Sequence, residues 1–238
     1  LLKGVRKLKH GTNLLYDLGT KRARTWAYWE YRLEPEEYFD NSEEDLATEL
    51  KSLLEISVKE RLTSDVPVGV LLSSGIDSNS IARIAANKIE QIKTFTVGFE
   101  DQSFDESRYV EKIALDLKSD HQTTILKASE MRDTLNRVNR MLDEPIADPS
   151  IIPTFLVCEF ASKSVKVALG GDGADELFAG YDTFSGLGFA RFANFCIPKF
   201  GIKKISRLID VMPFSSKNMS LDYKVRQAIR GLQHLPSA

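Results

Sequence analysis

The stretch VPVGVLLSSGIDS, residues 66–78, decides the fold that this sequence predicts. Its apolar part, residues 66–72, is short and continuous, as expected for a strand that is buried on both faces of a sheet. Small residues follow at 73–75, and apolar residues at helical spacing then predict a helix over 78–89. A buried strand that continues through such a loop into a helix is typical of a parallel α/β sheet.

The same alternation continues along the chain. The further expected strands are 94–99, 121–126 and 165–169, and the expected helices are about 104–117, 129–142 and 153–162. Strands that alternate with helices in this way predict an α/β fold with a doubly wound parallel sheet. Ligands of such a sheet bind beyond the carboxyl ends of its strands.

The flanking segments have different patterns. Residues 1–32 predict short extended pieces with turns at 10–11 and 18–19. The acidic, proline-containing stretch 34–42 marks a domain boundary, and Asn41 with Glu44 predicts a capping box for the helix that follows. The segment 186–238 is expected to be helical.

The composition is that of an ordinary globular protein. The 238 residues are 42% hydrophobic and 28% charged, which excludes a disordered or collagen-like chain. No apolar run approaches the roughly 20 residues of a membrane span, and the N-terminus lacks a signal peptide. We therefore expect a cytoplasmic protein, and the absence of an initiator methionine indicates an internal piece of a longer one.

Three single residues are expected to have no catalytic role. Cys158 and Cys196 are not at metal-binding spacing. Cys158 is expected to be a small core residue on its helix. His121 stands at the start of an expected strand and is expected to be structural.

The net charge of −2 conceals an uneven distribution. Residues 1–32 and 186–238 are basic, whereas residues 33–185 are acidic. Basic flanks can mark a nucleic-acid surface, but these basic residues are scattered rather than clustered in short runs. We therefore expect the flanks to contact an acidic neighbouring domain or a nucleotide polyphosphate, and we expect no nucleic-acid or membrane partner.

The loop at 73–78 predicts an anion site. Its small residues let the backbone approach a ligand, and the helix N-terminus directs N–H groups and a positive dipole at it. The loop is not a Walker A motif, since no Gly-Lys-Ser/Thr follows. Asp77 would repel phosphates unless a cation bridged them, which indicates Mg²⁺. Helix capping by Asp77 and Ser78 is the alternative explanation.

A second loop, GGDGADE at residues 170–176, directly follows the expected strand at 165–169. Asp172 and Asp175 are three residues apart, so a turn or helix start presents both to the same side. Helix capping with dipole compensation is the alternative, and Glu176 is expected to do only that. Two acidic, glycine-rich loops at one edge of a sheet favour a magnesium-nucleotide site.

The segment RLTSDVPVGVLLSSGIDS, residues 61–78, closely resembles the pyrophosphatase-loop segment of the glutamine-dependent asparagine synthetases. Further blocks agree in order, namely TVGF at 96–99, FDES at 104–107, DEP at 143–145, DPS at 148–150 and residues 170–181. The resemblance covers about 40–185 strongly, and residues 1–32 resemble the tail of the family's glutaminase domain. It implies a boundary between 1–39 and 40–238. The second part would be a C-terminally incomplete ATP pyrophosphatase domain of the adenine nucleotide alpha hydrolase (PP-loop ATPase) type.

The resemblance implies an AMP-forming carbon–nitrogen ligase. With ATP and Mg²⁺, the family adenylates the side-chain carboxylate of aspartate and releases pyrophosphate. Ammonia then displaces AMP to give asparagine. The ammonia would come from glutamine through the glutaminase domain of the same parent chain, and a homodimer is compatible with the family. Adenylation supplies the leaving group that a carboxylate lacks, and Mg²⁺ with loop N–H groups stabilises the departing pyrophosphate.

The resemblance also implies a role for each matching residue. Pyrophosphate would be held by Ser73, Gly75, Asp77 and Ser78. The AMP part would be framed by Leu72, Val97, Gly170 and Gly171. Asp77 and Asp175 would bind Mg²⁺. Asp172 stands where the family commonly has a glutamate thought to act as base on the attacking ammonia.

Three departures from the family pattern bear on activity. The loop reads Ser-Ser-Gly where the family usually has Ser-Gly-Gly, and a left-handed backbone at Ser74 would cost about 1–2 kcal/mol. Asp172 is one methylene shorter than glutamate. The N-terminal cysteine nucleophile of the glutaminase is absent, since position 1 is Leu1. The fragment is therefore expected to be inactive alone.

Three alternatives remain open at this point. The same chemistry could act on another carboxylic acid, as in β-lactam synthetase-like or sugar-amidating relatives. A tRNA-thiolating enzyme would need a catalytic cysteine near the loop, and neither Cys158 nor Cys196 fits. A nucleotide-binding module that has lost catalysis would explain the changes at Ser74 and Asp172.

Overall fold

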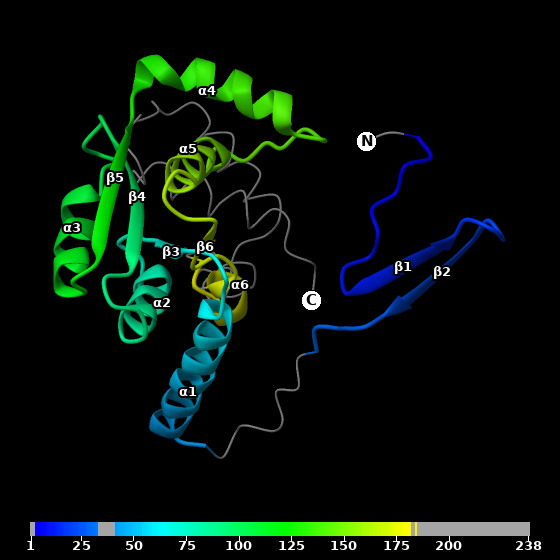
Figure 1. The fold of residues 1–238 in the computed structure, drawn as a ribbon, viewed down its shortest axis with the longest axis horizontal. Coiled ribbons are helices and arrows are strands. Elements are labelled where there is room, and N and C mark those ends of the chain that lie inside the picture. The colour runs from blue at the N-terminus through cyan, green and yellow to red at the C-terminus, as the bar shows by residue number, and fades with distance from the viewer. Residues whose placement is uncertain (1–2, 33–40, 182–183, 185–238) are drawn as a thin grey trace, which may run out of the picture. The chain divides into compact units, whose positions relative to one another are not determined.

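The computed structural model of the chain describes residues 3–32, 41–181 and 184 (Figure 1). The chain forms two compact units. One consists of Leu1–Leu53 with Leu142–Ile146, and the other of Leu54–Met141 with Ala147–Ala238.

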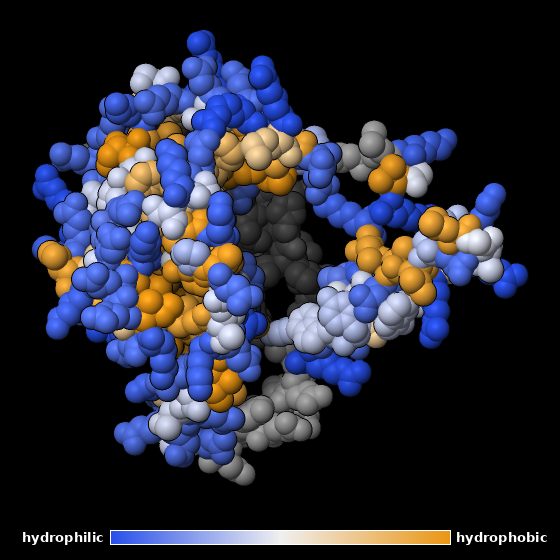
Figure 2. All heavy atoms as spheres, viewed as in Figure 1, coloured by the Kyte–Doolittle hydropathy of each residue, from blue (hydrophilic) through white to orange (hydrophobic). Residues whose placement is uncertain are grey.

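The first unit contains a β-hairpin. Strand β1 (Thr12–Asp17) pairs antiparallel with β2 (Arg22–Ala27), which confirms the extended pieces predicted near the N-terminus. The Asp17 carboxylate accepts a hydrogen bond from the Thr20 N–H at 2.6 Å and so closes the turn between the strands. Apolar and aromatic side chains gather on the surface of this hairpin (Figure 2).

Helix α1 (Glu43–Leu62) is capped one residue later than predicted. The Asp45 N–H donates to Ser42 Oγ at 3.1 Å, and the Ser42 hydroxyl donates to the Asp45 carboxylate at 2.6 Å. The predicted box of Asn41 and Glu44 was therefore wrong by one position. Ser42 and Asp45 have the same spacing, and the pattern alone does not separate the two pairs.

The second unit is built around a four-stranded sheet. Its elements are β3 (Val68–Leu71), α2 (Ile76–Ala86), β4 (Lys93–Phe99), α3 (Ser107–Asp116), β5 (Asp120–Leu126), α4 (Ala128–Met141), α5 (Ile151–Ala161), β6 (Val167–Leu169) and α6 (Ala174–Phe178). The strand order is β5-β4-β3-β6, and every pairing is parallel. The predicted α/β fold with a parallel sheet is confirmed, with the ends of elements shifted by a few residues.

Helices cover both faces of this sheet, so it is doubly wound (Figure 1). Successive side chains of a strand point to opposite faces. Val70 of β3 is fully buried with residues of α2 and α3, whereas its neighbour Leu71 packs on the side of α5. Phe95 of β4 is also fully buried on the α5 side. Burial on both faces explains why the sequence of β3 is continuously apolar.

The strand order creates a switch point between β3 and β6. From β3 the chain proceeds to β4 and then to β5, and it returns to β6 on the other side of β3. Ligands of open α/β sheets bind in the crevice at such a point, outside the carboxyl ends of the strands. The two acidic, glycine-rich loops at 73–78 and 170–176 follow β3 and β6, and both therefore start at this crevice.

The structure corrects one prediction about single residues and leaves others aside. Cys158 lies on α5 as predicted but is exposed, so its assignment to the core was wrong. Its neighbour Val157 takes the buried position, and adjacent residues of a helix point in different directions. Cys196 and the helices predicted in 186–238 lie outside the described residues. Within the described part, no helix is both long enough and apolar enough to cross a membrane.

Candidate functional site

A pocket of about 550 Å³ opens at the switch point between β3 and β6. All ten residues that the sequence singled out for the site line this pocket, namely Leu72, Ser73, Gly75, Asp77, Ser78, Val97, Gly170, Gly171, Asp172 and Asp175. They come from segments almost a hundred residues apart in the chain. The parallel sheet brings them together because the ends of β3, β4 and β6 share one edge.

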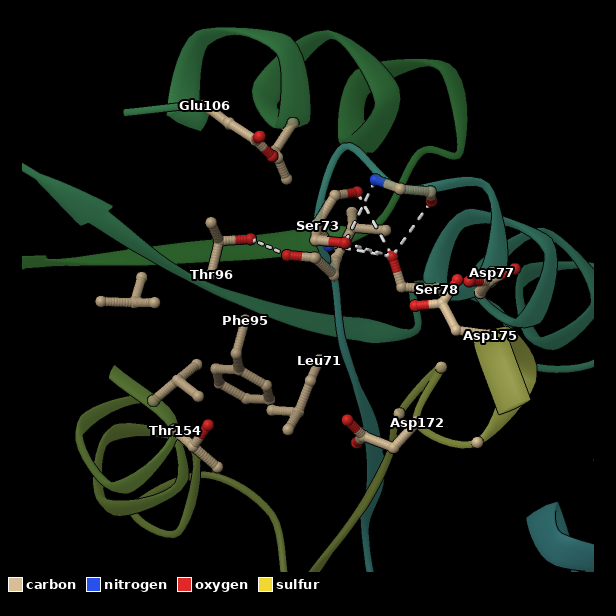
Figure 3. A pocket seen from close by; sticks show the side chains of 18 of the residues that line it. Leu71, Ser73, Asp77, Ser78, Phe95, Thr96, Glu106, Thr154, Asp172 and Asp175 are labelled. Atoms are coloured by element: carbon tan, nitrogen blue, oxygen red, sulfur yellow. Dashed lines mark hydrogen bonds between the residues drawn. The ribbon is translucent and has the colours of Figure 1, made fainter. Parts of the chain in front are cut away.

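Two serine side chains hold the loop after β3 in shape. The hydroxyl oxygens of Ser73 and Ser78 lie 2.8 Å apart, and Ser78 Oγ also accepts the Ser73 N–H at 3.1 Å. The Gly75 N–H donates to Ser73 Oγ at 3.2 Å. These bonds, dashed in Figure 3, bring the end of β3 against the first turn of α2.

Helix α2 begins without a side-chain cap. Its N-cap is Gly75, in an extended conformation with φ −66° and ψ 147°. Asp77 and Ser78 lie inside the first turn, so the alternative in which they merely cap the helix is not supported. The uncapped N–H groups and the positive end of the helix dipole therefore lie at the pocket wall, where an anion would be stabilised.

Gly171 allows the two loops to touch. A Cβ at this position would lie 2.8 Å from the Ser78 backbone nitrogen and 3.0 Å from Asp77 Cβ. Because glycine has no Cβ, the loop after β6 packs directly against the start of α2. Figure 3 shows Asp77 and Asp175 beside Ser78, while Asp172 lies apart from them in this view.

The segment after Asp175 folds back over that residue. The Gly180 N–H donates to the Asp175 carbonyl at 3.0 Å, and a Cβ on Gly180 would lie 2.1 Å from Asp175 Oδ1. Ala179 has the left-handed φ of 54° that this reversal requires. Asp175 itself is half-buried.

Glu176 does more than the helix-end compensation that the sequence predicted. Its carboxylate accepts a hydrogen bond from the Tyr181 hydroxyl at 2.5 Å. This bond raises the pKa of Tyr181 to about 12 and lowers the pKa of Glu176 below its usual value. Both residues line the pocket, so the phenol there stays protonated, and it is committed to Glu176 as a donor.

The donor set fits a magnesium ion that also binds substrate phosphates. Mg²⁺ in nucleotide enzymes is commonly held by one or two carboxylates, with phosphates and water completing the octahedron. Asp77 and Asp175 supply two carboxylates next to the uncapped start of α2. Within residues 3–32, 41–181 and 184, no group of three or more His, Cys, Asp or Glu side chains forms a metal site. Asp77 and Asp175 are the residues that would hold the ion.

Apolar side chains also line the pocket. They include Leu72, Val97 and the buried ring of Phe95. The hydroxyl of Thr96 is buried and donates to the Leu72 carbonyl at 2.5 Å, which ties the ends of β3 and β4 together. A flat apolar group such as a nucleobase would fit against these apolar side chains better than a phosphate would.

Ser74 does not have the strained backbone that its sequence context raised as a question. The described non-glycine residues with positive φ are Lys21, Gln91, Lys118 and Ala179. Ser74 is not among them, so the penalty considered for a left-handed serine does not apply. Its hydroxyl instead donates to Glu106 Oε2 at 2.5 Å.

Sequence reasoning missed five polar residues of the pocket, which are Thr96, Glu106, Thr154, Glu176 and Tyr181. Four of them, all but Thr154, lie within blocks that the resemblance singled out. Their position in a matching block was therefore the available signal. Thr154 lies on α5 and reaches the pocket only because that helix packs on the sheet.

His121 lies on β5 and is not part of the pocket lining. Its ring nitrogens lie 2.9 Å from Thr94 Oγ1 and 3.1 Å from Thr123 Oγ1. Burial lowers its pKa below the ordinary 6.5. These contacts support the structural role predicted for this histidine.

Residues 49–234 match the protein family described as asparagine synthase. The putative glutamine-hydrolyzing asparagine synthetase 2 of Methanocaldococcus jannaschii is 35% identical over 185 residues, which cover 77% of this chain and 35% of the relative. The glutamine-hydrolyzing asparagine synthetase 1 of Bacillus subtilis is 38% identical over 181 residues, with 75% and 28% covered. The chain thus spans about a third of the length of these relatives. Among solved structures, an NH3-dependent NAD synthetase from Campylobacter jejuni aligns with a TM-score of 0.38 and 13% identity, covering 83% of this chain and 99% of that one.

Proposed function

Because the chain belongs to the asparagine synthase family, we propose that it is the ATP-dependent ligase domain of a glutamine-hydrolyzing asparagine synthetase. It would adenylate the side-chain carboxylate of aspartate and release pyrophosphate. Ammonia derived from glutamine would then displace AMP to give asparagine. The observation that carries this proposal is the pocket at the switch point, which gathers both acidic, glycine-rich loops in one cavity.

The loop after β3 would bind the phosphates of ATP. Ser73, Gly75 and Ser78 form a compact turn at the uncapped start of α2, where N–H groups and the helix dipole favour an anion. A magnesium ion held by Asp77 and Asp175 would offset the negative charge of the leaving pyrophosphate. Leu72, Val97, Gly170 and Gly171, which line the same pocket, would surround the AMP part.

Asp172 is the proposed base on the attacking ammonia. It is exposed at the pocket edge, and it lies apart from Asp77 and Asp175 in Figure 3. A carboxylate outside the metal pair would remain able to accept a proton from the nucleophile. This separation gives the two aspartates of the second loop different roles.

The rest of the reaction would need parts outside this chain. The proposed partners are aspartate, ammonia and the glutaminase domain of the same parent protein, with residues 1–39 as the end of that domain and 40–238 as the ligase domain. We propose a cytoplasmic enzyme, a homodimer as its assembly, and no nucleic-acid or membrane partner. The family match over residues 49–234 lies within the proposed ligase domain.

Phosphorus NMR of the nucleotide products tests this function. The full-length parent protein and this chain would each be incubated with ATP, Mg²⁺ and ammonium, with and without aspartate. AMP and pyrophosphate that form only with aspartate are the expected products. AMP formed only with another acid would keep the mechanism and change the substrate. ADP with phosphate would contradict the assignment of the loop, and binding without turnover would indicate a module that has lost catalysis.

A further inference from the structure

The hydrogen bond between Ser74 and Glu106 connects two loops that leave neighbouring strands. Ser74 lies in the loop after β3, and Glu106 lies between β4 and α3. The Ser74 hydroxyl donates to Glu106 Oε2 at 2.5 Å. Ser74 takes no part in the Ser73–Ser78 network, so this bond is a second, separate tether on the same loop.

Glu106 stands on a well-supported part of the chain. Its carbonyl accepts the N–H groups of Tyr109 and Val110 at 2.9 and 3.1 Å, which starts α3. The adjacent Asp105 accepts hydrogen bonds from the Phe99 N–H and from the Ser107 hydroxyl and N–H. Although burial raises the pKa of Asp105, these bonds outweigh it and lower the pKa below its usual value. The backbone that carries Glu106 is therefore fixed on both sides.

The Glu106 side chain does not cap its own helix. No side-chain cap bond exists at the start of α3, although Glu106 is its N-cap residue. The side chain instead lines the pocket and reaches the loop after β3. In Figure 3 it descends from the helix drawn at the top, on the side of Ser73 away from Asp172 and Asp175.

We propose that Ser74 and Glu106 form a positioning pair that holds the loop after β3 in its phosphate-binding shape. This inference rests on the proposed ATP site and adds two residues to it that act through the loop. The serine networks fix the ends of the loop, and the Ser74–Glu106 bond fixes its middle from the side of α3. Loss of the bond would let the N–H groups of residues 75–78 move before ATP arrives, and the affinity for ATP would fall.

A purely electrostatic role for Glu106 predicts the opposite sign. A carboxylate that only faced the phosphate site would repel ATP, so its removal would tighten binding. A positioning role predicts weaker binding after removal of either partner. The two partners would then show no further loss when removed together, because either change already breaks the same bond.

The test is a double-mutant cycle on ATP binding in the full-length parent protein. The variants are Ser74→Ala, Glu106→Ala and their combination, with Ser74→Thr as the conservative variant that keeps the hydroxyl. The controls are Ser80→Ala, whose hydroxyl donates to a carbonyl within α2, and Glu111→Gln, an exposed carboxylate on α3. Calorimetry would give the dissociation constant for ATP-Mg²⁺, and turnover would give KM for ATP and kcat.

Loss of one charge-assisted hydrogen bond is expected to raise the dissociation constant and KM for ATP about tenfold. We expect kcat to change less than twofold and Ser74→Thr to keep the wild-type affinity for ATP. The double variant should have the same dissociation constant for ATP as the single variants. Hydrogen exchange of the unliganded protein would show faster exchange at the amides of Ser73, Gly75 and Asn79, which donate hydrogen bonds within this loop. This second readout does not depend on ATP.

Each contrary result overturns a defined statement. Tighter ATP binding in Glu106→Ala would establish simple repulsion and overturn the positioning pair. Additive losses in the double variant, or unchanged exchange at the Ser73, Gly75 and Asn79 amides, would also overturn it. A wild-type protein that binds no ATP would overturn the proposed function. In that case hydrogen exchange would still test the pair, because unchanged exchange rates in the variants would overturn it without any ATP present.

Discussion

Gly171→Ala adds a single methyl group, and the structure predicts that it disturbs both the fold and the candidate site. The new Cβ would lie 2.8 Å from the Ser78 nitrogen, 3.0 Å from Asp77 Cβ and 3.2 Å from the Asp77 carbonyl carbon. These atoms are backbone or are attached directly to it, so no side-chain rotation can make room. The loop after β6 must therefore move away from the start of α2.

The size of the effect follows from the cost of overpacking. An extra carbon forced into a well-packed place typically costs about 1–3 kcal/mol of unfolding free energy. In a domain of this size each kcal/mol lowers Tm by about 2–4 °C, so a decrease of roughly 2–12 °C is expected. ATP binding should weaken as well, because the moved loop carries Asp172 and Asp175.

Gly170→Ala is the matched control. The nearest atom to its Cβ would be Asp172 Oδ2 at 2.9 Å, the far end of a side chain that can rotate. We expect a change in unfolding free energy within about 0.5 kcal/mol. Chemical denaturation and calorimetric ATP binding of both variants would be measured side by side. Equal stability of the two variants would refute the steric reasoning for Gly171.

Four further outcomes are expected. Asp77→Asn should abolish Mg²⁺-dependent AMP formation while the circular dichroism spectrum stays that of the wild type; undiminished turnover would contradict the metal assignment. Asp172→Asn should spare adenylation, followed as aspartate-dependent pyrophosphate exchange, and slow amide formation by roughly 10²–10⁴-fold; equal loss of both steps would argue against a base. Gly180→Ala should displace the Asp175 carboxylate, because Oδ1 of Asp175 would lie 2.1 Å from the new Cβ. The Mg²⁺ concentration needed for half-maximal activity should rise, with little change in Tm. A wild-type Mg²⁺ dependence would show that Asp175 does not bind the metal. Burial lowers the pKa of His121 below 6.5, so the unfolded chain binds more protons than the folded one, and the unfolding free energy should fall as the pH drops below about 6.5. His121→Gln should reduce this difference in unfolding free energy between denaturation curves at pH 5 and pH 8. An unchanged difference would show that other groups cause the pH dependence.

The sequence predicted the fold well because each pattern had a single physical cause. The continuous apolar run at 66–72 could satisfy burial on two faces only inside a parallel sheet, and the structure has β3 there. The capping box failed by one residue, since Asn41 with Glu44 and Ser42 with Asp45 are equivalent as patterns. The prediction that Cys158 lies in the core was wrong because its helix buries Val157 and points the next side chain outward.

The site residues that the sequence predicted are those that stand in conspicuous loops after expected strands. Acidic, glycine-rich loops directly after strands of a parallel sheet are rarely needed for folding, so they pointed to Asp77, Asp172 and Asp175 without any structure. The sequence could not predict which loop would lie beside which. Thr154 and Glu106 enter the pocket only through the packing of α5 and α3 against the sheet.

The sequence by itself determined the order of strands and helices, the two loops that carry charge and the family to which the chain belongs, because these depend on local patterns and short motifs. The tertiary structure decided the strand order β5-β4-β3-β6, which places the loops after β3 and β6 on either side of one crevice. It also decided that Gly171 packs on Ser78 and that Ser74 reaches Glu106. Contacts between residues 32 and 93 positions apart depend on how helices pack on a sheet, and no local pattern contains that information.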